Sequence, residues 1–292
     1  MIEKTNFGST DLYTITGGEL SVSFMTLGAT MTSLKFRGNE TVLSFDNPER
    51  YIAEKDYVCQ TVGRYANRIG ASRFTMDGTE YVLPDNENGN QLHGGPDSYN
   101  SRIWDARIDG ETLEMSILSP DGDNGFPGQL KMTMRFSVKE NTLHIDFLAE
   151  TDKKTVFAPT VHPYFLVSDY RKALLQVNAK THLECDAELI PTGRILPCEG
   201  AYDFSQPTKI GLALDDCFPI ESEYACRFTS DDYAVEMWTD MPAAQVFTGK
   251  HSSVAIEPEF YPDSPNHPEF PSTVLNPGES FRKYAEYKFF AL

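Results

Sequence analysis

The sequence is short of basic residues and of long apolar runs, and each shortage excludes a class of protein. Its 292 residues carry 25 Lys and Arg against 43 Asp and Glu, a formal net charge of −18. Such a chain repels the phosphate backbone of DNA or RNA, so we expect no nucleic-acid partner. No run approaches the roughly 18 apolar residues of a membrane span, and the opening MIEKTNFGST lacks the apolar stretch of a signal peptide. We therefore expect a cytoplasmic protein without membrane contact.

Cysteine pairs and cofactor motifs are also missing. The chain has five cysteines, an odd number, and no CxxC spacing. This pattern argues against a disulfide framework or a zinc cluster, so we expect free thiols packed as small apolar side chains. GxGxxG, Walker, HExxH and GxSxG motifs are absent as well. Nucleotide binding, zinc-protease chemistry and the hydrolase nucleophile are not indicated, and we expect no cofactor and no metal.

What is present is apolar–polar alternation, which predicts β-strands. It is clearest over residues 113–117, 130–138, 143–147 and 281–289. A short helix is expected only at 47–55, where Asn47 precedes Pro48. Long segments of period 3.6 and linkers rich in Pro, Ser or Gly are lacking. We therefore predict one all-β domain over residues 1–292, a sandwich of antiparallel sheets.

Residues 63–95 place polar side chains at both ends of a predicted hairpin. The Asp-Gly pair at 77–78 is the turn sequence whose positive φ angles match the twist of paired strands. The glycines after the histidine are expected to let a ligand approach the backbone. Each arginine either binds a ligand or pairs with one of the many acids. The polar residues at the two ends are Arg64, Asn67, Arg68 and His93.

Two further polar residues lie in segments predicted to be apolar strands, where a polar side chain is unusual. His162 lies in the run FAPTVHPYFLVS, with Tyr164 on the same strand face. It is either a core histidine bonded to backbone or a site residue. Glu257 ends the apolar VAIE, and Pro258 is expected to end that strand. It is either an exposed strand-end acid or a buried one, whose pKa would rise and which would then serve as a base.

Glu259 gives Glu257 a possible carboxylate partner. Along a regular strand the two would be about 6.6 Å apart, near the separation in inverting glycosidases. Glycoside hydrolysis is therefore a weak alternative for this pair.

Taken in order along the chain, several segments resemble the aldose 1-epimerases, the galactose mutarotases. The segments are GRYANRI, NQLHGG, DGDNGFPG, HPYF, IPTG, LDDCF, QVFTG and EPEFYPDSPNHPEFPSTVLNPGE. This resemblance implies a galactose-mutarotase-like antiparallel β supersandwich. It also implies conversion between the α and β anomers of free aldoses without a cofactor.

The resemblance further implies roles for individual residues. Glu257 matches the general base, His162 the general acid and His93 the histidine near the sugar ring oxygen. Substrate-binding positions are implied for Asn67, Arg68, Tyr164, Asp215 and Gln245, and Arg64 is expected to join them. Trp238, Phe247 or Tyr164 are candidates for an apolar surface facing the sugar.

The sequence departs from the family pattern at LDDCF. Where DHNF is common, this chain has Asp216 and Cys217, which bears on substrate preference. Two other functions stay open: a hexose-6-phosphate 1-epimerase of the same superfamily, and a non-catalytic carbohydrate-binding protein. The expected partner is a small sugar, and the sequence does not distinguish a monomer from a homodimer.

Overall fold

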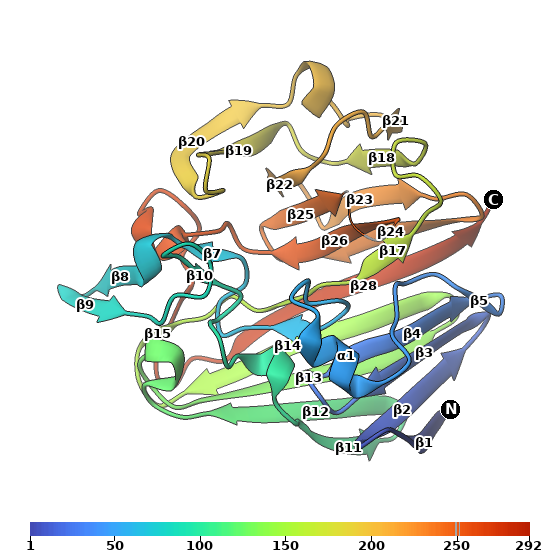
Figure 1. Cartoon of the computed structure of the whole chain (residues 1–292), viewed down its shortest axis with the longest axis horizontal. Coiled ribbons are helices and arrows are strands. Elements are labelled where there is room, and N and C mark those ends of the chain that lie inside the picture. Colours follow the sequence, from blue (N-terminus) through green and yellow to red (C-terminus); the bar gives the residue numbers. More distant parts are fainter. Residues whose placement is uncertain (249, 251) are drawn as a thin grey trace.

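The computed structural model describes residues 1–248, 250 and 252–292, and most of its regular structure is β (Figure 1). Gly249, the last residue of the QVFTG motif, lies outside the described residues. All pairings between the labelled strands are antiparallel, as the alternation predicted. In the described part of the chain, no helix is long and apolar enough to cross a membrane.

A nine-stranded sheet forms one layer. In spatial order it consists of β11 (Asp105–Asp109), β12 (Thr112–Ser119), β13 (Leu130–Lys139), β14 (Thr142–Thr151), β28 (Phe281–Ala291), β24 (Tyr233–Thr239), β23 (Tyr224–Thr229), β18 (Leu174–Val177) and β21 (Thr208–Lys209). The C-terminal strand β28 lies between β14 and β24 and so joins the middle of the chain to its last third. Alternate residues of β12 to β14 are buried, because one face of the sheet covers the core.

Two smaller sheets pack on this long one (Figure 1). The first has β1 (Ile2–Phe7), β2 (Thr10–Gly17), β3 (Leu20–Met25), β4 (Thr30–Phe36) and β5 (Asn39–Glu40); the second has β17 (Tyr164–Leu166), β26 (Ser253–Glu259), β25 (Ala243–Thr248) and β22 (Asp215–Pro219). Phe24 of β3 stacks on Phe136 of β13 with ring centroids 4.0 Å apart. Phe165 of β17 contacts Tyr287 of β28 at 5.5 Å. The result is an extended sandwich, as predicted.

Short elements connect these sheets. The two-stranded ladders are β6 (Thr61–Val62) with β16 (Thr160–Val161), β7 (Arg68–Ile69) with β10 (Gln91–Leu92), β8 (Arg73–Met76) with β9 (Thr79–Val82), β15 (Thr155–Val156) with β27 (Val274–Leu275), and β19 (Thr181–Cys185) with β20 (Pro191–Pro197). The helices are α1 (Pro48–Ala53) and the 3-10 turns η1 (Gly70–Ser72), η2 (Tyr99–Ser101), η3 (Asp123–Gly125), η4 (Gly200–Tyr202) and η5 (Ser264–Asn266).

Two local predictions are confirmed and one is wrong. Asp77 and Gly78 join β8 to β9 with φ angles of 51° and 77°. The short helix forms as α1, and the Asn47 side chain accepts a hydrogen bond from the Arg50 N–H at its start. Pro258, however, does not end its strand. β26 continues to Glu259. Proline lacks only the backbone N–H as a hydrogen-bond donor, and Pro258 still pairs in register with Ala244 of β25.

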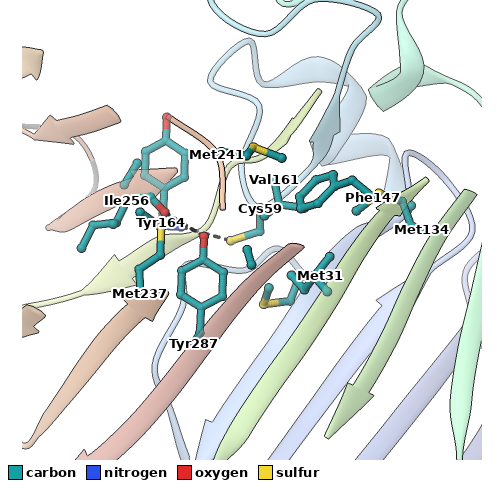
Figure 2. Packing of buried hydrophobic residues seen from close by; sticks show 14 of the residues in the cluster. Met31, Cys59, Met134, Phe147, Val161, Tyr164, Met237, Met241, Ile256 and Tyr287 are labelled. Atoms are coloured by element: carbon teal, nitrogen blue, oxygen red, sulfur yellow. Dashed lines mark hydrogen bonds between the residues drawn. The ribbon is translucent and has the colours of Figure 1, made fainter. Parts of the chain in front are cut away.

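Cys59, Val161, Tyr164 and Ile256 pack together in the apolar core (Figure 2). The Tyr164 N–H donates to Cys59 Sγ at 3.4 Å, and the Tyr287 hydroxyl donates to the Ile256 carbonyl at 2.9 Å. Burial raises the pKa of the Cys59 thiol to about 12, so it stays protonated. The five cysteines are free thiols, as predicted, and Cys59 packs as part of the core.

Candidate active site

A pocket of about 190 Å³ is lined by residues of β22, β25 and β26 and by loop segments that are far apart in the sequence. Its lining residues are Lys55, Asp56, Tyr57, Asn67, Arg68, Glu87, Leu92, His93, His162, Tyr164, Asp215, Gln245, Phe247, Lys250 and Glu257. The structure thus brings together all the site residues predicted from sequence except Arg64.

His162 and Glu257 face each other inside this pocket. Nε2 of His162 lies 3.4 Å from Oε1 of Glu257, and both side chains are more than 90% buried. His162 follows β16, where its N–H donates to the Gln60 carbonyl at 3.0 Å. Its ring stacks on Tyr164 with centroids 4.8 Å apart. An imidazole and a carboxyl group this close can pass a proton between them. They can also act together on one ligand, one group taking a proton while the other gives one.

Sheet register places the next two polar groups. Gln245 of β25 is opposite Glu257 of β26 and Cys217 of β22. The Gln245 amide donates from Nε2 to Asp215 Oδ1 at 2.7 Å. Its Oε1 is buried without a protein partner, as is Oε2 of Glu257. Buried polar atoms without partners are rare, so both are candidates for ligand hydrogen bonds.

Asn67 and His93 form a second unit, built across β7 and β10. Both have left-handed backbone, with φ angles of 58° and 51°. The Asn67 N–H donates to His93 Nδ1 at 3.1 Å, and the His93 N–H donates to the Asn67 carbonyl at 2.9 Å. Since Nδ1 accepts, the proton of the neutral ring is on Nε2. Burial, His162 and Arg68 lower the pKa of His93 well below its ordinary value, so the ring is neutral.

Arg68 is held by acids on either side. Its Nε and Nη2 donate to the two oxygens of Glu87 at 2.6 and 3.1 Å, a bidentate pair. Its Nη1 lies 3.3 Å from Asn67 Oδ1 and 3.7 Å from Asp215 Oδ2. The guanidinium therefore faces the pocket in a fixed orientation and supplies positive charge among several carboxylates.

Burial shifts the acids and His162 toward their neutral forms. Desolvation, with Glu259 and Asp215 nearby, raises the pKa of Glu257 well above its ordinary value. Burial also raises the pKa of Glu259 to about 8 and lowers that of His162 to about 4. Burial therefore favours Glu257 as a carboxylic acid and His162 as a neutral imidazole, and in this form the pair carries one proton.

Arg64 does not reach the pocket, so its predicted contact with substrate does not fit the structure. Its guanidinium is buried and donates to the carbonyls of Ser119, Pro120, Pro127 and Gly128 and to the hydroxyls of Ser119 and Thr155. It anchors the loop between β12 and β13. Arg64 precedes β7, which begins at Arg68, so the two arginines do not share a strand.

Replacing Arg64 by Met should lower the free energy of unfolding by about 3–5 kcal/mol, because several buried acceptors lose their donor. Thermal unfolding should then fall by roughly 10 °C. The matched control is Arg68→Met, which should lower kcat/KM at least about tenfold with the smaller loss of stability. An Arg64→Met protein of normal stability with weak substrate binding would instead restore Arg64 to the site.

Two smaller expectations also fail. Gly94 does not make room for a ligand: a Cβ there would lie 2.2 Å from the carbonyl oxygen of Gly63, so the glycine permits two backbone segments to pack. Trp238 is 36% exposed and packs on Tyr224, away from the pocket. Phe247 and Tyr164 do line it, although the Tyr164 hydroxyl already donates to the Asp56 carbonyl at 2.7 Å.

Some lining residues were not found from the sequence. Tyr57 packs on the His93 ring at 4.4 Å, and Glu87 orients Arg68. Lys55 and Lys250 lie at the rim, where Lys250 pairs with Asp56. These residues come from loops of ordinary polar composition, so no pattern marked them. Among the described residues, no group of three His, Cys, Asp or Glu side chains is arranged to hold a metal ion.

Comparison with solved structures defines the class of protein. The model superposes on a GalM/aldose epimerase homologue from Caenorhabditis elegans with a TM-score of 0.93 and 26% identity, covering 97% of this chain and 100% of that one. For galactose 1-epimerase from Lactobacillus acidophilus the TM-score is 0.90 at 25% identity, with 100% and 98% covered. The predicted galactose-mutarotase-like supersandwich is confirmed.

Sequence comparison gives the family. The aldose 1-epimerase family model matches residues 11–288, and the chain belongs to that family. It is 30% identical to galactose mutarotase of Rattus norvegicus, with 97% of this chain and 94% of the relative covered. It is 32% identical to aldose 1-epimerase of Escherichia coli K12, with 92% of each covered.

Proposed function

We propose that the protein is an isomerase that interconverts the α and β anomers of free aldohexoses such as galactose or glucose. The observation that carries this proposal is the buried pair of His162 and Glu257, 3.4 Å apart and open to a small polar pocket. The names of its relatives, galactose mutarotase and aldose 1-epimerase, agree with it.

The reaction requires one proton to leave the anomeric hydroxyl and one to reach the ring oxygen. Glu257 as a carboxylate takes the first, and His162 as an imidazolium gives the second, so that the ring opens to an aldehyde. Rotation about the bond between the first and second carbons presents the other face of the carbonyl. The same two groups then run the transfers in reverse and close the ring.

The pair of His162 and Glu257 has the right number of protons for this chemistry. Burial disfavours the charged form of both groups and so favours the proton on Glu257. Its transfer across the 3.4 Å gap to His162 gives the carboxylate and the imidazolium together. A polar substrate and Arg68 stabilise that charged form against the cost of burial.

The remaining residues bind and orient the sugar. His93 presents its Nε2–H, and Arg68 its guanidinium, to the ring oxygen as negative charge develops there. Asn67, Asp215 and Gln245 suit hydrogen bonds to the hydroxyls, and Phe247 supplies apolar contact. Tyr164 acts through its ring, which supports His162.

Polarimetry of freshly dissolved α-galactose and α-glucose tests the activity. Catalytic amounts of the protein should speed the approach to the equilibrium rotation well beyond the rate in buffer alone. An unchanged rate for every aldose in a panel of galactose, glucose, xylose and arabinose would refute the proposal. If calorimetry then still detected sugar binding, a non-catalytic carbohydrate-binding protein would be the better description.

A hexose-6-phosphate 1-epimerase is the second candidate, and Lys55 and Lys250 at the rim are the observation in its favour. Lys250 is already paired with Asp56, and Arg68 with Glu87, which leaves little free positive charge for a phosphate. We therefore expect glucose to react faster than glucose 6-phosphate. The reverse order would make the phosphate ester the substrate.

We also propose that residues 1–292 act as one domain in the cytoplasm. One continuous apolar core that joins the long sheet to both smaller sheets supports the first point, and five free thiols support the second. The high negative charge argues against nucleic acid as a partner. Light scattering would decide between a monomer and a homodimer, and a single cooperative unfolding transition is expected for one domain.

A further inference from the structure

Carboxyl groups outnumber cations in the pocket that holds His162 and Glu257. Among the lining residues that the structure describes, the basic ones are Lys55, Arg68 and Lys250, and the acidic ones are Asp56, Glu87, Asp215 and Glu257. The proposed reaction uses Glu257 as the base and Asp215 as a partner for sugar hydroxyls. It makes no direct use of Glu87 or Asp56, so the presence of these two acids calls for a separate explanation.

Glu87 holds the guanidinium of Arg68 in a bidentate pair. Its two oxygens accept from Nε at 2.6 Å and from Nη2 at 3.1 Å, and the two side chains are only 28% and 10% exposed. Asp215 lies farther from Arg68, 3.7 Å from Nη1, and accepts from Gln245 at 2.7 Å instead. Bidentate pairs that are shielded from water are stronger than exposed ones. Glu87 is therefore the acid that chiefly compensates the charge of Arg68.

The turn that carries Glu87 is itself held by hydrogen bonds. The Glu87 N–H donates to the Asn90 carbonyl at 3.1 Å, and the Asn90 N–H donates to the Glu87 carbonyl at 2.9 Å. The Asn86 side chain accepts from the Leu92 N–H at 2.7 Å and donates to the Leu92 carbonyl at 3.0 Å. These bonds fix the backbone on both sides of Glu87 and keep its carboxylate beside Arg68.

Asp56 compensates a second cation of the pocket. The Lys250 ammonium pairs with Asp56 Oδ1 and lies 5.9 Å from the centroid of the Phe247 ring. The Tyr164 hydroxyl donates to the Asp56 carbonyl at 2.7 Å, which anchors the loop. The Lys250 side chain is 48% exposed, so water screens this pair more than it screens the pair of Arg68 and Glu87.

These two pairs bear on the charge that a substrate can carry. An anionic aldose, such as a hexose 6-phosphate or a hexuronate, needs a cation such as Arg68 or Lys250 for its phosphate or carboxylate. Each of these cations already has a carboxylate partner. The anion would have to displace that partner or lie beside it as a like charge, and either is unfavourable. A neutral aldose avoids both, because its hydroxyls can donate to the carboxylates.

We propose that Glu87 and Asp56 are specificity residues, which make the pocket reject anionic aldoses by holding carboxylates against Arg68 and Lys250. The inference rests on the proposed mutarotase activity and adds the side chains that restrict its substrate to a neutral sugar. A repulsive element against the wrong ligand is one of the two routes to specificity. Glu87 has the larger effect, because its ion pair is the more shielded of the two.

The test measures kcat/KM for glucose, glucose 6-phosphate and galacturonate by NMR exchange between anomers. Glu87→Gln keeps an oxygen that accepts from Arg68 but removes the negative charge. The ratio of kcat/KM for glucose 6-phosphate to that for glucose should therefore rise about tenfold, mainly through a lower KM for the phosphate. Asp56→Asn should raise the ratio about threefold, because its pair is more exposed. The double variant should combine the two effects, and galacturonate should follow the same order with smaller changes.

A ratio is used because Glu87→Gln also loosens Arg68, which acts on both sugars alike. Asp85→Asn is the matched control. Asp85 is exposed, lies two positions before Glu87 and does not line the pocket. Its replacement removes the same charge from the same part of the surface but leaves the carboxylate beside Arg68. The ratio in Asp85→Asn should equal that of the wild type.

Three results would overturn the inference while leaving the mutarotase intact. One is a wild-type ratio in folded Glu87→Gln and Asp56→Asn proteins, another is an equal rise in Asp85→Asn, and the third is a wild type that already prefers glucose 6-phosphate. If no aldose reacts, the mutarotase proposal itself fails. Calorimetry with glucose 6-phosphate then still tests the two acids: tighter binding to Glu87→Gln than to the wild type supports their role, and equal binding rejects it.

Discussion

Replacing Glu257 by Gln should lower kcat for anomer exchange by about 10² to 10⁴-fold, the usual contribution of a general acid–base group. Gln keeps the shape and the hydrogen-bonding capacity of the side chain, but it cannot take a proton from the anomeric hydroxyl. Burial raises the pKa of Glu257 and so favours its neutral form. Replacing it with a neutral amide should therefore not unfold the protein. We expect KM to change little. Polarimetry at saturating sugar separates the two constants.

Glu259→Gln provides the matched control. Glu259 is two positions along β26, equally buried, and does not line the pocket. Its Oε2 accepts from Asn67 Nδ2 at 3.4 Å, and a glutamine oxygen can accept the same bond. Activity should stay within about tenfold of the wild type. If instead Glu257→Gln works nearly normally while Glu259→Gln does not, the base has been assigned to the wrong carboxyl group.

Replacing His162 by Asn should also cost about 10² to 10⁴-fold in kcat, because the ring oxygen would lose its proton donor. Asn retains polarity but has no group that gains or loses a proton near neutral pH. His144→Asn serves as the control: His144 is on β14, contacts Glu286 and Asp146, and is absent from the pocket lining. Unimpaired turnover in His162→Asn would remove this residue from the mechanism.

The pH profile of the wild type gives a second readout for the same residue. An isolated histidine acting as acid would lose its proton, and its activity, as pH rises through about 6.5. The pair of His162 and Glu257 instead keeps one proton around neutral pH, since burial raises the pKa of Glu257 and lowers that of His162. We therefore expect no loss of rate as pH rises through about 6.5. The rate should decline as pH falls toward about 4, because His162 is then protonated while Glu257 keeps its own proton. With both groups protonated, no carboxylate is left to act as the base. A rate that falls as pH rises, with its midpoint near pH 6.5, would contradict the proposal that His162 and Glu257 share one proton.

The strands were predictable because their signal is local. Alternating residues in β12, β13 and β14 mark which side chains are buried, and the Asp-Gly pair at 77–78 marks a turn. What could not be read locally was the extent of β26. A proline ends a strand only where its missing N–H is needed, and that depends on the neighbouring strand.

The site residues were predictable by type and only partly by placement. Glu257, His162, Asn67, Arg68 and His93 carry motif information and meet in one pocket. Arg64 shares the same motif yet faces the other way, bonded to the loop after β12. Glu87, Tyr57 and Lys250 line the pocket from loops without any pattern. A side chain's direction in an irregular segment is set by contacts with residues distant in sequence, which a linear pattern does not contain.

By itself, then, the sequence determined an acidic, all-β chain with motifs of the aldose 1-epimerase family. The tertiary structure alone decided that His162 and Glu257 are close enough to share a proton, that Glu259 is buried beside them, and that Glu87 and Asp56 pair with cations of the pocket. The physical reason is that pKa and charge pairing depend on burial and on distance. Both are properties of groups brought together from β10, β16, β22 and β26, and no single segment holds them.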